Sequence, residues 1–428
     1  MGSEHHTPAS LPQRVDLWLA RAEGDVEFRA ALRKIALRID FDFGDFRRSL
    51  ELPAALPATA QKVHIALAAE PELWQHVLVP QPDLGYHSFT ALERLVPGFH
   101  IEADPADVAR TLHALERLLE IGRGDVVRDA APAADLDRVT GRYQTVHAGG
   151  TTARVYHEHA GSGTPLVMLH TAGADSRQYL DLITRTDIVE HWSCHAFDMP
   201  LHGRSSSPEG WEWGEYKLAM DEYVSWCLAF IEQVIGRPAV VMGCSMGAGI
   251  AVALAASGSP WVRGIVALEA PDRAPGRLNP YLSHPCVDGA DYAAAYVRGL
   301  MSPASPVADR RHASWIYAQG GPGIYPGDLW FYSEEYDGMA LAPQIDTERC
   351  PVWLLTGAYD YSAPPESTER LQAAIPGACF TLMPDLGHFP MTENPIRFYR
   401  YLGPVLADLE QTLASGTAGS QPSQEPPQ

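Results

Sequence analysis

One pattern recurs from residue 165 to residue 388: a run of apolar residues of strand length, followed in most cases by a segment long enough for a helix. Strands that are apolar on both sides must be covered on both faces, as in parallel sheets whose crossovers are helices. The pattern therefore predicts an α/β fold with a mostly parallel sheet and helices on both faces. The strand candidates are PLVMLH (165–170), SCHAFDMP (193–200), AVVMGCS (239–245), VRGIVALEA (262–270), CPVWLLTGAYD (350–360) and CFTLMPDLGH (379–388).

The rest of the chain divides by composition. Residues 1–11 and 414–428 are polar and rich in Pro, Gly or Ser, which predicts disordered ends. Residues 12–127 mix helical and alternating patterns and predict a small α+β domain. The Pro-, Ala- and Asp-rich stretch 128–139 predicts a linker. Residues 140–413 then form the α/β domain, which we expect to open with a hairpin.

Charge and cysteine content limit the partners of this chain. Its 428 residues carry 53 acidic and 32 basic side chains, a net charge of −21, which argues against binding to nucleic acid or to an anionic membrane surface. No run of about 18 apolar residues is present, so we expect a cytoplasmic protein without membrane insertion. The six cysteines are scattered and lack CxxC spacing, which predicts reduced thiols. Neither a metal nor an organic cofactor is expected.

A serine stands between two glycines where a strand pattern becomes a helix pattern, in Gly243-Cys244-Ser245-Met246-Gly247. One interpretation is structural: the glycines allow a tight turn, and Ser245 caps the helix. The other is catalytic, because a GxSxG sequence after a buried strand is typical of a nucleophile elbow. The pattern needs partner residues before the second interpretation can be preferred.

Partner residues stand at the ends of the other strand candidates. In an open parallel sheet, reactive groups gather at the carboxyl ends of the strands. Asp360 ends one strand candidate, and His388 follows the last one. The order Ser245, Asp360, His388 is the order found in α/β-hydrolases and differs from those of the chymotrypsin and subtilisin types. The chain at this point resembles the α/β-hydrolase family over residues 143–413, through HTAG, DMPLHGRS, GCSMG, GAYD and DLGHF in register.

This resemblance implies a role for each residue. His388 would accept the proton of the Ser245 hydroxyl, and Asp360 would fix the imidazole tautomer and stabilise its cation. The oxyanion of the tetrahedral intermediate needs two donors. The N–H of Met246 would be one, and the N–H of Ala172, with Thr171 or Gly173 as neighbours, would be the other.

Several of these residues also have a structural interpretation, which stays open here. His388 could be an ordinary surface histidine, Asp360 could cap a following helix, and Asp385 is typical of a turn. Asp198 and His202 resemble a structural turn of the family, and His170 is expected to shape its loop through hydrogen bonds. Cys244 occupies the variable place of the elbow and is assigned no chemistry.

The segment from Pro271 to Asp346 lacks the strand pattern and is rich in Trp and Tyr, which predicts a cap over the site at about 271–346. Aromatic side chains supply much of the apolar contact area in ligand pockets, so the expected substrate is hydrophobic and neutral. The residues expected to contact it are Thr171, Arg177, Trp315, Tyr317 and Trp330, although Arg177 has the equal alternative of an exposed helix residue, and the aromatics that of core packing.

Hydrolysis of a carboxylic ester or lactone needs only the groups named so far. Carbon–carbon bond hydrolysis of a diketone-like substrate uses the same groups and stays an alternative, as does a biosynthetic acyltransferase or cyclase on the same fold. A peroxidase-like side activity also remains open, whereas haloalkane dehalogenation is disfavoured because it requires an aspartate at the place of Ser245. A fold used only for binding is disfavoured by the intact set of candidate catalytic residues.

The N-terminal block has its own pattern. Helical periodicity through Phe28, Leu32 and Ile35 gives way to alternation from Ile39 to Phe43, which predicts a helix followed by a hairpin. Together with VHIALAAEPELWQHVL and GFHIEADPADVARTLHALERLLEIG, the block resembles small lipid-binding domains similar to sterol carrier protein. This resemblance implies delivery of an apolar ligand or a shield over the site. A packing domain, or one that joins copies into a homo-oligomer, is the alternative.

Overall fold

The computed structural model describes residues 10–56, 60–130, 134–212 and 214–415, which form two compact units. The first unit runs to Val126 and also contains His284–Gly299, and the second unit contains the remaining residues. The domain boundaries derived from the sequence stay a prediction. The structure groups His284–Gly299 with the first unit, although these residues lie inside the predicted cap. We call residues 271–346 the cap segment.

The predicted disordered ends lie mostly outside the described residues, as do residues 131–133 of the predicted linker. At both ends a helix extends into residues that the composition predicted to be disordered. Helix α1 begins at Leu11, after Ser10 as its N-cap, and helix α16 continues to Ser415.

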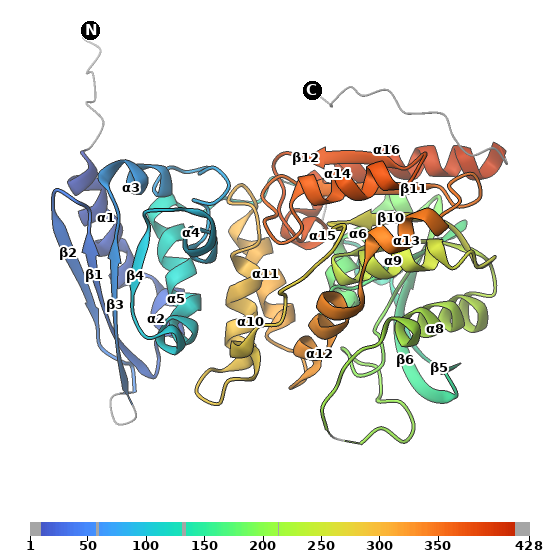
Figure 1. Ribbon diagram of the computed structural model, residues 1–428, viewed down its shortest axis with the longest axis horizontal. Coiled ribbons are helices and arrows are strands. Elements are labelled where there is room, and N and C mark those ends of the chain that lie inside the picture. Colours follow the sequence, from blue (N-terminus) through green and yellow to red (C-terminus); the bar gives the residue numbers. More distant parts are fainter. Residues whose placement is uncertain (1–9, 57–59, 131–133, 213, 416–428) are drawn as a thin grey trace, which may run out of the picture. The chain divides into compact units, whose positions relative to one another are not determined.

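The first unit is built on a four-stranded sheet in the order β2-β1-β3-β4, in which β1 is parallel to β3 and the other pairs are antiparallel. The helical interpretation of Ile35 is wrong: α2 ends at Ala31, and Ile35 opens β1, where it pairs with Gln61 of β3. The elements, drawn in Figure 1, are α1 (Leu11–Gly24), α2 (Val26–Ala31), β1 (Ile35–Asp42), β2 (Arg47–Leu52), β3 (Gln61–Ala68), α3 (Pro71–Val77), α4 (Phe89–Leu95), β4 (His100–Glu102), α5 (Pro105–Arg123) and α10 (Gly289–Arg298).

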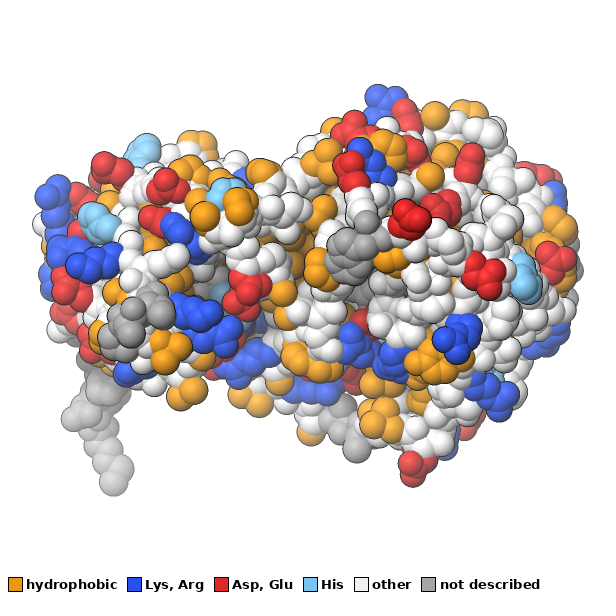
Figure 2. All heavy atoms as spheres, turned by 90° about the horizontal axis from the view of Figure 1, so that it is seen from below, with side chains coloured by type: hydrophobic (Ala, Val, Ile, Leu, Met, Phe, Trp, Pro, Cys, Tyr) orange, Lys and Arg blue, Asp and Glu red, His pale blue; other side chains and the backbone are white. Residues whose placement is uncertain are grey.

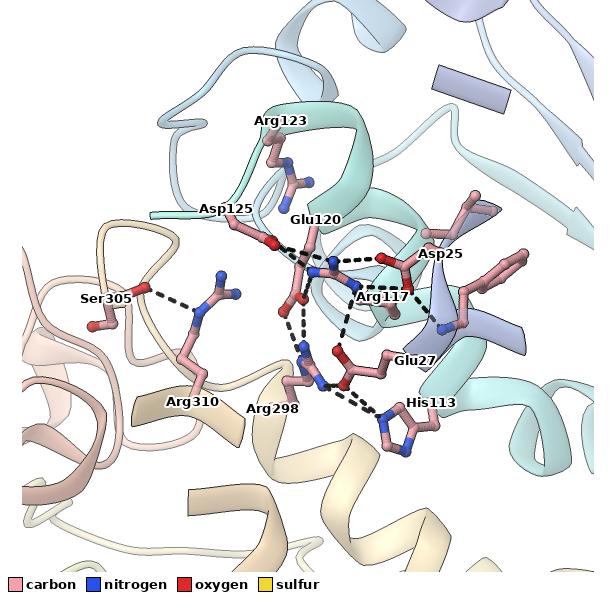
Figure 3. Close-up of polar contacts among 12 residues, drawn as sticks. Asp25, Glu27, His113, Arg117, Glu120, Arg123, Asp125, Arg298, Ser305 and Arg310 are labelled. Carbon is pink, nitrogen blue, oxygen red and sulfur yellow. Dashed lines mark hydrogen bonds and ion pairs between the residues drawn. The ribbon is translucent and has the colours of Figure 1, made fainter. Parts of the chain in front are cut away.

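A buried network of charges holds α10 in the first unit (Figure 3). The guanidinium of Arg298, at the end of α10, donates to both carboxylate oxygens of Glu120 on α5, at 2.7 and 2.5 Å, and to Glu27. Arg117, also on α5, pairs with Asp25 at 2.7 Å. Only 1% of the Arg298 side chain is exposed, so its charge depends on these carboxylates for compensation.

The second unit contains an eight-stranded sheet in the order β12-β11-β10-β9-β7-β8-β6-β5. The pairs from β8 to β12 are parallel, while β5 pairs antiparallel with β6, and β6 with β8. The strands of this unit are β5 (Thr140–Ala148), β6 (Thr151–Ala160), β7 (Thr164–Leu169), β8 (Trp192–Phe197), β9 (Ala239–Cys244), β10 (Val262–Leu268), β11 (Val352–Gly357) and β12 (Cys379–Met383).

Helices of the second unit cover both faces of this sheet, which confirms the predicted α/β fold. Along β7, Leu166 and Met168 belong to one core with α6 and α16, whereas Val167 and Leu169 belong to a second core with α8 and α9. The α-helices of this unit are α6 (Leu180–Ile183), α7 (Thr186–Val189), α8 (Met220–Phe230), α9 (Met246–Ala256), α11 (Val307–Tyr317), α12 (Ile324–Trp330), α13 (Gly338–Leu341), α14 (Pro365–Ala374), α15 (Pro390–Glu393) and α16 (Pro395–Ser415).

The surface carries mixed charge. Figure 2 shows acidic and basic side chains interspersed on the face it displays. Among the helices of the described residues, none is both long enough and apolar enough to cross a membrane. All six cysteines lie in described parts of the chain, and none of them is in a disulfide.

Candidate active site

Ser245 occupies a strained turn between β9 and α9. Its φ of 54° is in a region that only glycine adopts without cost, so the turn departs from the usual backbone of a serine. The flanking glycines are required by space, because a Cβ on Gly243 would lie 2.2 Å from the carbonyl oxygen of Gly247, and one on Gly247 would lie 2.6 Å from that of Leu169. The Ser245 side chain makes no capping hydrogen bond to α9 within the described chain, so the helix-cap interpretation finds no support.

The structure brings Ser245, His388 and Asp360 into one hydrogen-bonded line. His388 Nε2 lies 2.9 Å from Ser245 Oγ, and His388 Nδ1 lies 2.6 Å from Asp360 Oδ2. All three residues are buried. Because Asp360 offers only acceptor oxygens when ionised, Nδ1 carries the proton in the neutral ring, and Nε2 is left free to accept one from Ser245.

The loops that carry Asp360 and His388 are themselves held by hydrogen bonds. Asp360 Oδ1 accepts the N–H groups of Ser362 at 2.7 Å and Ala363 at 2.9 Å, but α14 begins later, at Pro365, and has Pro364 as its N-cap. Asp360 therefore does not cap that helix. The N–H of His388 donates to the carbonyl oxygen of Leu300 at 3.0 Å, which fixes the histidine backbone to the cap segment.

A second buried carboxyl group, not identified from the sequence, adjoins Asp360. Glu269 follows β10 with a φ of 55°, is fully buried, and accepts the N–H of Gly357 at 3.0 Å. Burial, and then the neighbouring Asp360, raises the pKa of Glu269 well above its ordinary value. Burial alone would raise the pKa of Asp360 too, but His388 and a hydrogen bond from Glu269 lower it. Glu269 is thus a neutral acid that donates to an ionised Asp360.

Glu269, Asp360 and His388 are also the one group among the described residues whose geometry could hold a metal ion, since their ligand atoms lie within 4.8 Å of one another. Hydrogen bonds also join Asp360 to His388 and to Glu269. Shared protons therefore account for the close approach of these three side chains.

The two residues predicted to supply oxyanion donors lie at the start of α9 and in the loop after β7. Met246 is the first residue of α9, where backbone N–H groups have no partner within the helix. In the loop after β7, the N–H of Thr171 donates to Gln178 Oε1 at 3.0 Å and the N–H of Gly173 donates to Asp328 Oδ2 at 2.7 Å. In the described part of the chain no acceptor is found for the N–H of Ala172, so it is the N–H of this loop that is left for a ligand.

The remaining polar residues of the motifs make structural contacts. His170 Nε2 accepts the N–H of Met199 at 3.2 Å, so its Nδ1–H donates to the carbonyl oxygen of Thr171 at 2.9 Å. Asp198 accepts the N–H groups of Ser176 and Arg204 at 2.8 and 2.7 Å, as a turn-forming residue would. Asp385 hydrogen-bonds Tyr401 at 2.9 Å and pairs with Arg397.

The structure does not bring the predicted substrate residues to Ser245 as a group. Arg177 donates to Asp175 at 2.7 Å, with its guanidinium 4.9 Å from the ring centre of the half-exposed Trp315. The hydroxyl of Tyr317 is hydrogen-bonded to Thr171 Oγ1. The ring of Trp330 lies 5.6 Å from the amino group of Lys217. Contact of these side chains with a substrate stays a prediction.

Tyr332 of the cap segment, in contrast, lies next to the candidate nucleophile. It belongs to a π-helical turn, Phe331–Glu335, a backbone form often found at functional sites. The phenol is buried, which raises its pKa, and Ser245 is among the groups that interact with it. The Tyr332 hydroxyl is buried, and among the described residues it has no hydrogen bond of normal geometry.

Glu269 could have been found from the sequence by the reasoning that located Asp360. It is the polar residue at the end of the strand candidate 262–270. Tyr332 gave no comparable signal, because nothing in the aromatic-rich cap segment distinguishes it from its neighbours.

Comparison with known proteins places this chain in a family. The model of the alpha/beta hydrolase family matches residues 166–400. Uncharacterized proteins of Mycobacterium tuberculosis and Mycobacterium bovis are 22% identical over 293 residues, which cover 63% of this chain and 82% of each relative.

Solved structures agree on the fold. A thermophilic esterase from Thermogutta terrifontis has a TM-score of 0.51 at 19% identity, and the matched region covers 63% of this chain and 99% of the esterase. The enol-lactonase of Burkholderia xenovorans has a TM-score of 0.51 at 18% identity, over 63% and 100%. A bromoperoxidase from Bacillus anthracis has a TM-score of 0.53 at 19% identity, over 62% and 100%. At these identities the likeness establishes the fold alone.

Proposed function

The chain belongs to the alpha/beta hydrolase family, and from this premise we propose that it is a serine hydrolase that cleaves a carboxylic ester or lactone through an acyl-enzyme on Ser245. The observation that carries the proposal is the continuous line from Ser245 Oγ to His388 at 2.9 Å and from His388 to Asp360 at 2.6 Å. Hydrolytic activity is general in this superfamily, and the bond that is cleaved is the part we infer.

The reaction begins with proton transfer. His388 Nε2 takes the proton of Ser245 Oγ as the oxygen attacks the substrate carbonyl, and the ionised Asp360 stabilises the imidazolium that forms. The negative oxygen of the tetrahedral intermediate receives the N–H groups of Met246 and Ala172. His388 then gives its proton to the leaving alcohol, and a water molecule, activated by the same histidine, releases the acid.

The backbone donors have a large expected share in the rate. Removing one donor from an oxyanion hole typically raises the barrier by about 2.7–4 kcal/mol. The effect is large because such donors are already oriented in a site from which water is excluded. In this chain the burial of Ala172 and Met246 supports that condition.

The expected substrate is apolar at the reacting end. Phe389, next to His388, packs its ring against that of Tyr317 with centroids 5.4 Å apart, and Tyr332 lies beside Ser245. Apolar walls with few polar groups are typical of small-molecule sites. We therefore expect esters or lactones with an aromatic or aliphatic acyl group.

Covalent labelling tests the proposal. A fluorophosphonate should label Ser245, and a short-chain nitrophenyl ester should release nitrophenol with a burst equal to the enzyme concentration. Ser245→Ala should abolish both signals. Ser257→Ala, at an exposed serine just beyond the other end of α9, is the matched control and should retain them.

Turnover of the ester by Ser245→Ala at the wild-type rate would refute the acyl-enzyme. A parallel screen of lactones and diketones separates ester chemistry from carbon–carbon hydrolysis. Labelling of Ser245 without hydrolysis of any of these substrates would favour an acyltransferase or cyclase.

A further inference from the structure

Hydrogen bonds hold the residues on both sides of Ala172, whereas the N–H of Ala172 is the donor that the proposed reaction uses. The carbonyl oxygen of Thr171 accepts His170 Nδ1–H at 2.9 Å and the N–H of Ala174 at 3.2 Å. In a trans peptide the N–H points opposite to the C=O, so these bonds orient the N–H of Ala172 away from His170. The loop contains Gly173, with a φ of 70°, and glycine does not resist rotation of the peptides around it. External contacts must therefore hold this conformation.

Asp328, on helix α12 of the cap segment, supplies such a contact. It is fully buried, and its Oδ2 accepts the N–H of Gly173 at 2.7 Å. The same oxygen lies 2.8 Å from His202 Nε2, and Oδ1 accepts the hydroxyl of Tyr216 at 3.1 Å. Gly327 lets α12 approach closely, because a Cβ there would lie 2.4 Å from the carbonyl oxygen of Tyr216.

His202 carries a positive charge opposite Asp328. Its Nδ1 lies 3.0 Å from the carbonyl oxygen of Pro200, and its Nε2 faces the Asp328 carboxylate, so both ring nitrogens must donate. Burial alone would lower the pKa of His202, but Asp328 raises it above its ordinary value. The pair is nearly inaccessible to water, with 1% of the His202 side chain and none of the Asp328 side chain exposed. A buried pair of this kind has one well-defined geometry, because breaking it leaves an uncompensated charge.

Two further residues of the cap segment contact the same loop. Tyr317, at the end of α11, hydrogen-bonds Thr171 Oγ1 on one side of Ala172. On the other side the ring of Tyr325 covers Gly173 so closely that a Cβ there would lie 2.6 Å from the ring. The cap segment thus holds both neighbours of Ala172, by hydrogen bonds to Thr171 and to Gly173.

We propose that Asp328 is a positioning residue of the oxyanion hole: from the cap segment it holds Gly173 and, through it, aims the N–H of Ala172 at the carbonyl oxygen of the substrate, which becomes the oxyanion when Ser245 attacks. The inference rests on the proposed function. It assigns to the cap segment a part in transition-state stabilisation, in addition to covering the substrate. Asp328 itself touches neither the substrate nor the reacting atoms.

The test compares Asp328→Ala and Asp328→Asn with wild type. The readouts are kcat and KM for a nitrophenyl ester, and the inhibition constant of a trifluoromethyl ketone, whose adduct with serine places an oxyanion in the hole. Asp328→Ala should lower kcat by about 10- to 100-fold, less than the loss of a whole donor, and weaken the ketone by a similar factor while KM stays within about twofold. Asp328→Asn keeps an oxygen for the N–H of Gly173, so its loss should be smaller.

The matched control is Asp272→Asn. Asp272 also joins the cap segment to the core, since its carboxylate accepts a hydrogen bond from Arg370 Nε of α14 at 2.6 Å, but none of its hydrogen bonds goes to the loop of Ala172. It should leave kcat and the ketone constant unchanged. If Asp328→Ala does not fold, the Asn variant carries the test.

An unchanged ratio of ketone constant to KM in a folded Asp328 variant would overturn the inference. The proposed function would survive that result, provided that wild type is labelled at Ser245 and turns over the ester. Failure of wild type in those two assays would instead refute the proposed function.

Discussion

The buried carboxyl group of Glu393 predicts how the stability of the fold changes with pH. This fully buried carboxyl group on α15 accepts the N–H groups of Gly387 at 2.8 Å and Phe389 at 3.3 Å, on either side of His388. It also accepts the N–H of Ser302 at 3.1 Å and the hydroxyl of Ser305 at 2.9 Å, both from the cap segment. Burial raises the pKa of Glu393 to about 7, although these four donors offset part of the effect.

The size of the effect follows from linkage. The pKa rises from 4.5 in the unfolded chain to about 7 in the folded one, a difference of about 2.5 units. One unit corresponds to about 1.36 kcal/mol, so complete ionisation of Glu393 in the folded state costs about 3.4 kcal/mol of stability. The folded protein retains this proton at pH values where the unfolded chain has lost it. The stabilisation is therefore fully present below about pH 4.5 and is lost as the pH rises to about 7.

Glu393→Gln should remove this dependence, because the amide does not titrate. The assay is urea unfolding of wild type and variant from pH 5 to pH 8, from which the difference in free energy of unfolding is plotted against pH. We expect wild type to lose about 2.5 kcal/mol relative to the variant across that range. Glu334→Gln, at an exposed glutamate, controls for the removal of one negative charge. A flat difference for Glu393→Gln would refute the reasoning.

Substitutions at three other residues test separate parts of the structure. Asp360→Asn should lower kcat by about 10³- to 10⁴-fold with little change in KM, because the amide stabilises the wrong tautomer of His388; a loss below tenfold would contradict the assignment. Glu269→Gln keeps a donor for Asp360 and should retain kcat within several-fold, whereas Glu269→Leu removes a charge-assisted hydrogen bond worth about 1.5–3 kcal/mol; equal kcat values for the two variants would refute a donor role. Arg298→Met removes one of the two guanidinium partners of the buried Glu120 and leaves Arg117, so it should lower the melting temperature and cost less than the about 3–5 kcal/mol of a fully unpaired buried charge; an unchanged melting temperature would contradict the buried network of Figure 3.

The sheet of the second unit was predictable because its signal is local. Each strand is a continuous apolar run, and β9 and β11 have every residue buried. The meeting of Ser245, Asp360 and His388 followed from the same pattern, since the carboxyl ends of neighbouring parallel strands share one edge. The order of the motifs favoured their proximity, and the structure decided against a helix cap at Asp360 and a surface position for His388.

The contacts of the cap segment were not predictable, because they join residues that have no sequence pattern in common. Asp328 lies within a short helix, 155 residues from the glycine whose N–H it accepts. Arg298 is separated from Glu120 by 178 residues, and its helix resembles any other amphipathic helix, so its grouping with the first unit left no trace in composition. The error at Ile35 had a local cause. Phe28, Leu32 and Ile35 are apolar at helical spacing, but the last of them is already the first residue of β1.

The cap segment contacts each part of the proposed machinery within the second unit. The carbonyl oxygen of Leu300 holds the backbone of His388, Asp328 holds Gly173, and Tyr332 lies beside Ser245. A segment that only covered the substrate would affect KM when altered. Because these contacts hold the proposed base, a proposed oxyanion donor and the surroundings of Ser245, substitutions that remove them should act mainly on kcat. Binding of the substrate and assembly of the reacting geometry are then governed by the same stretch of chain.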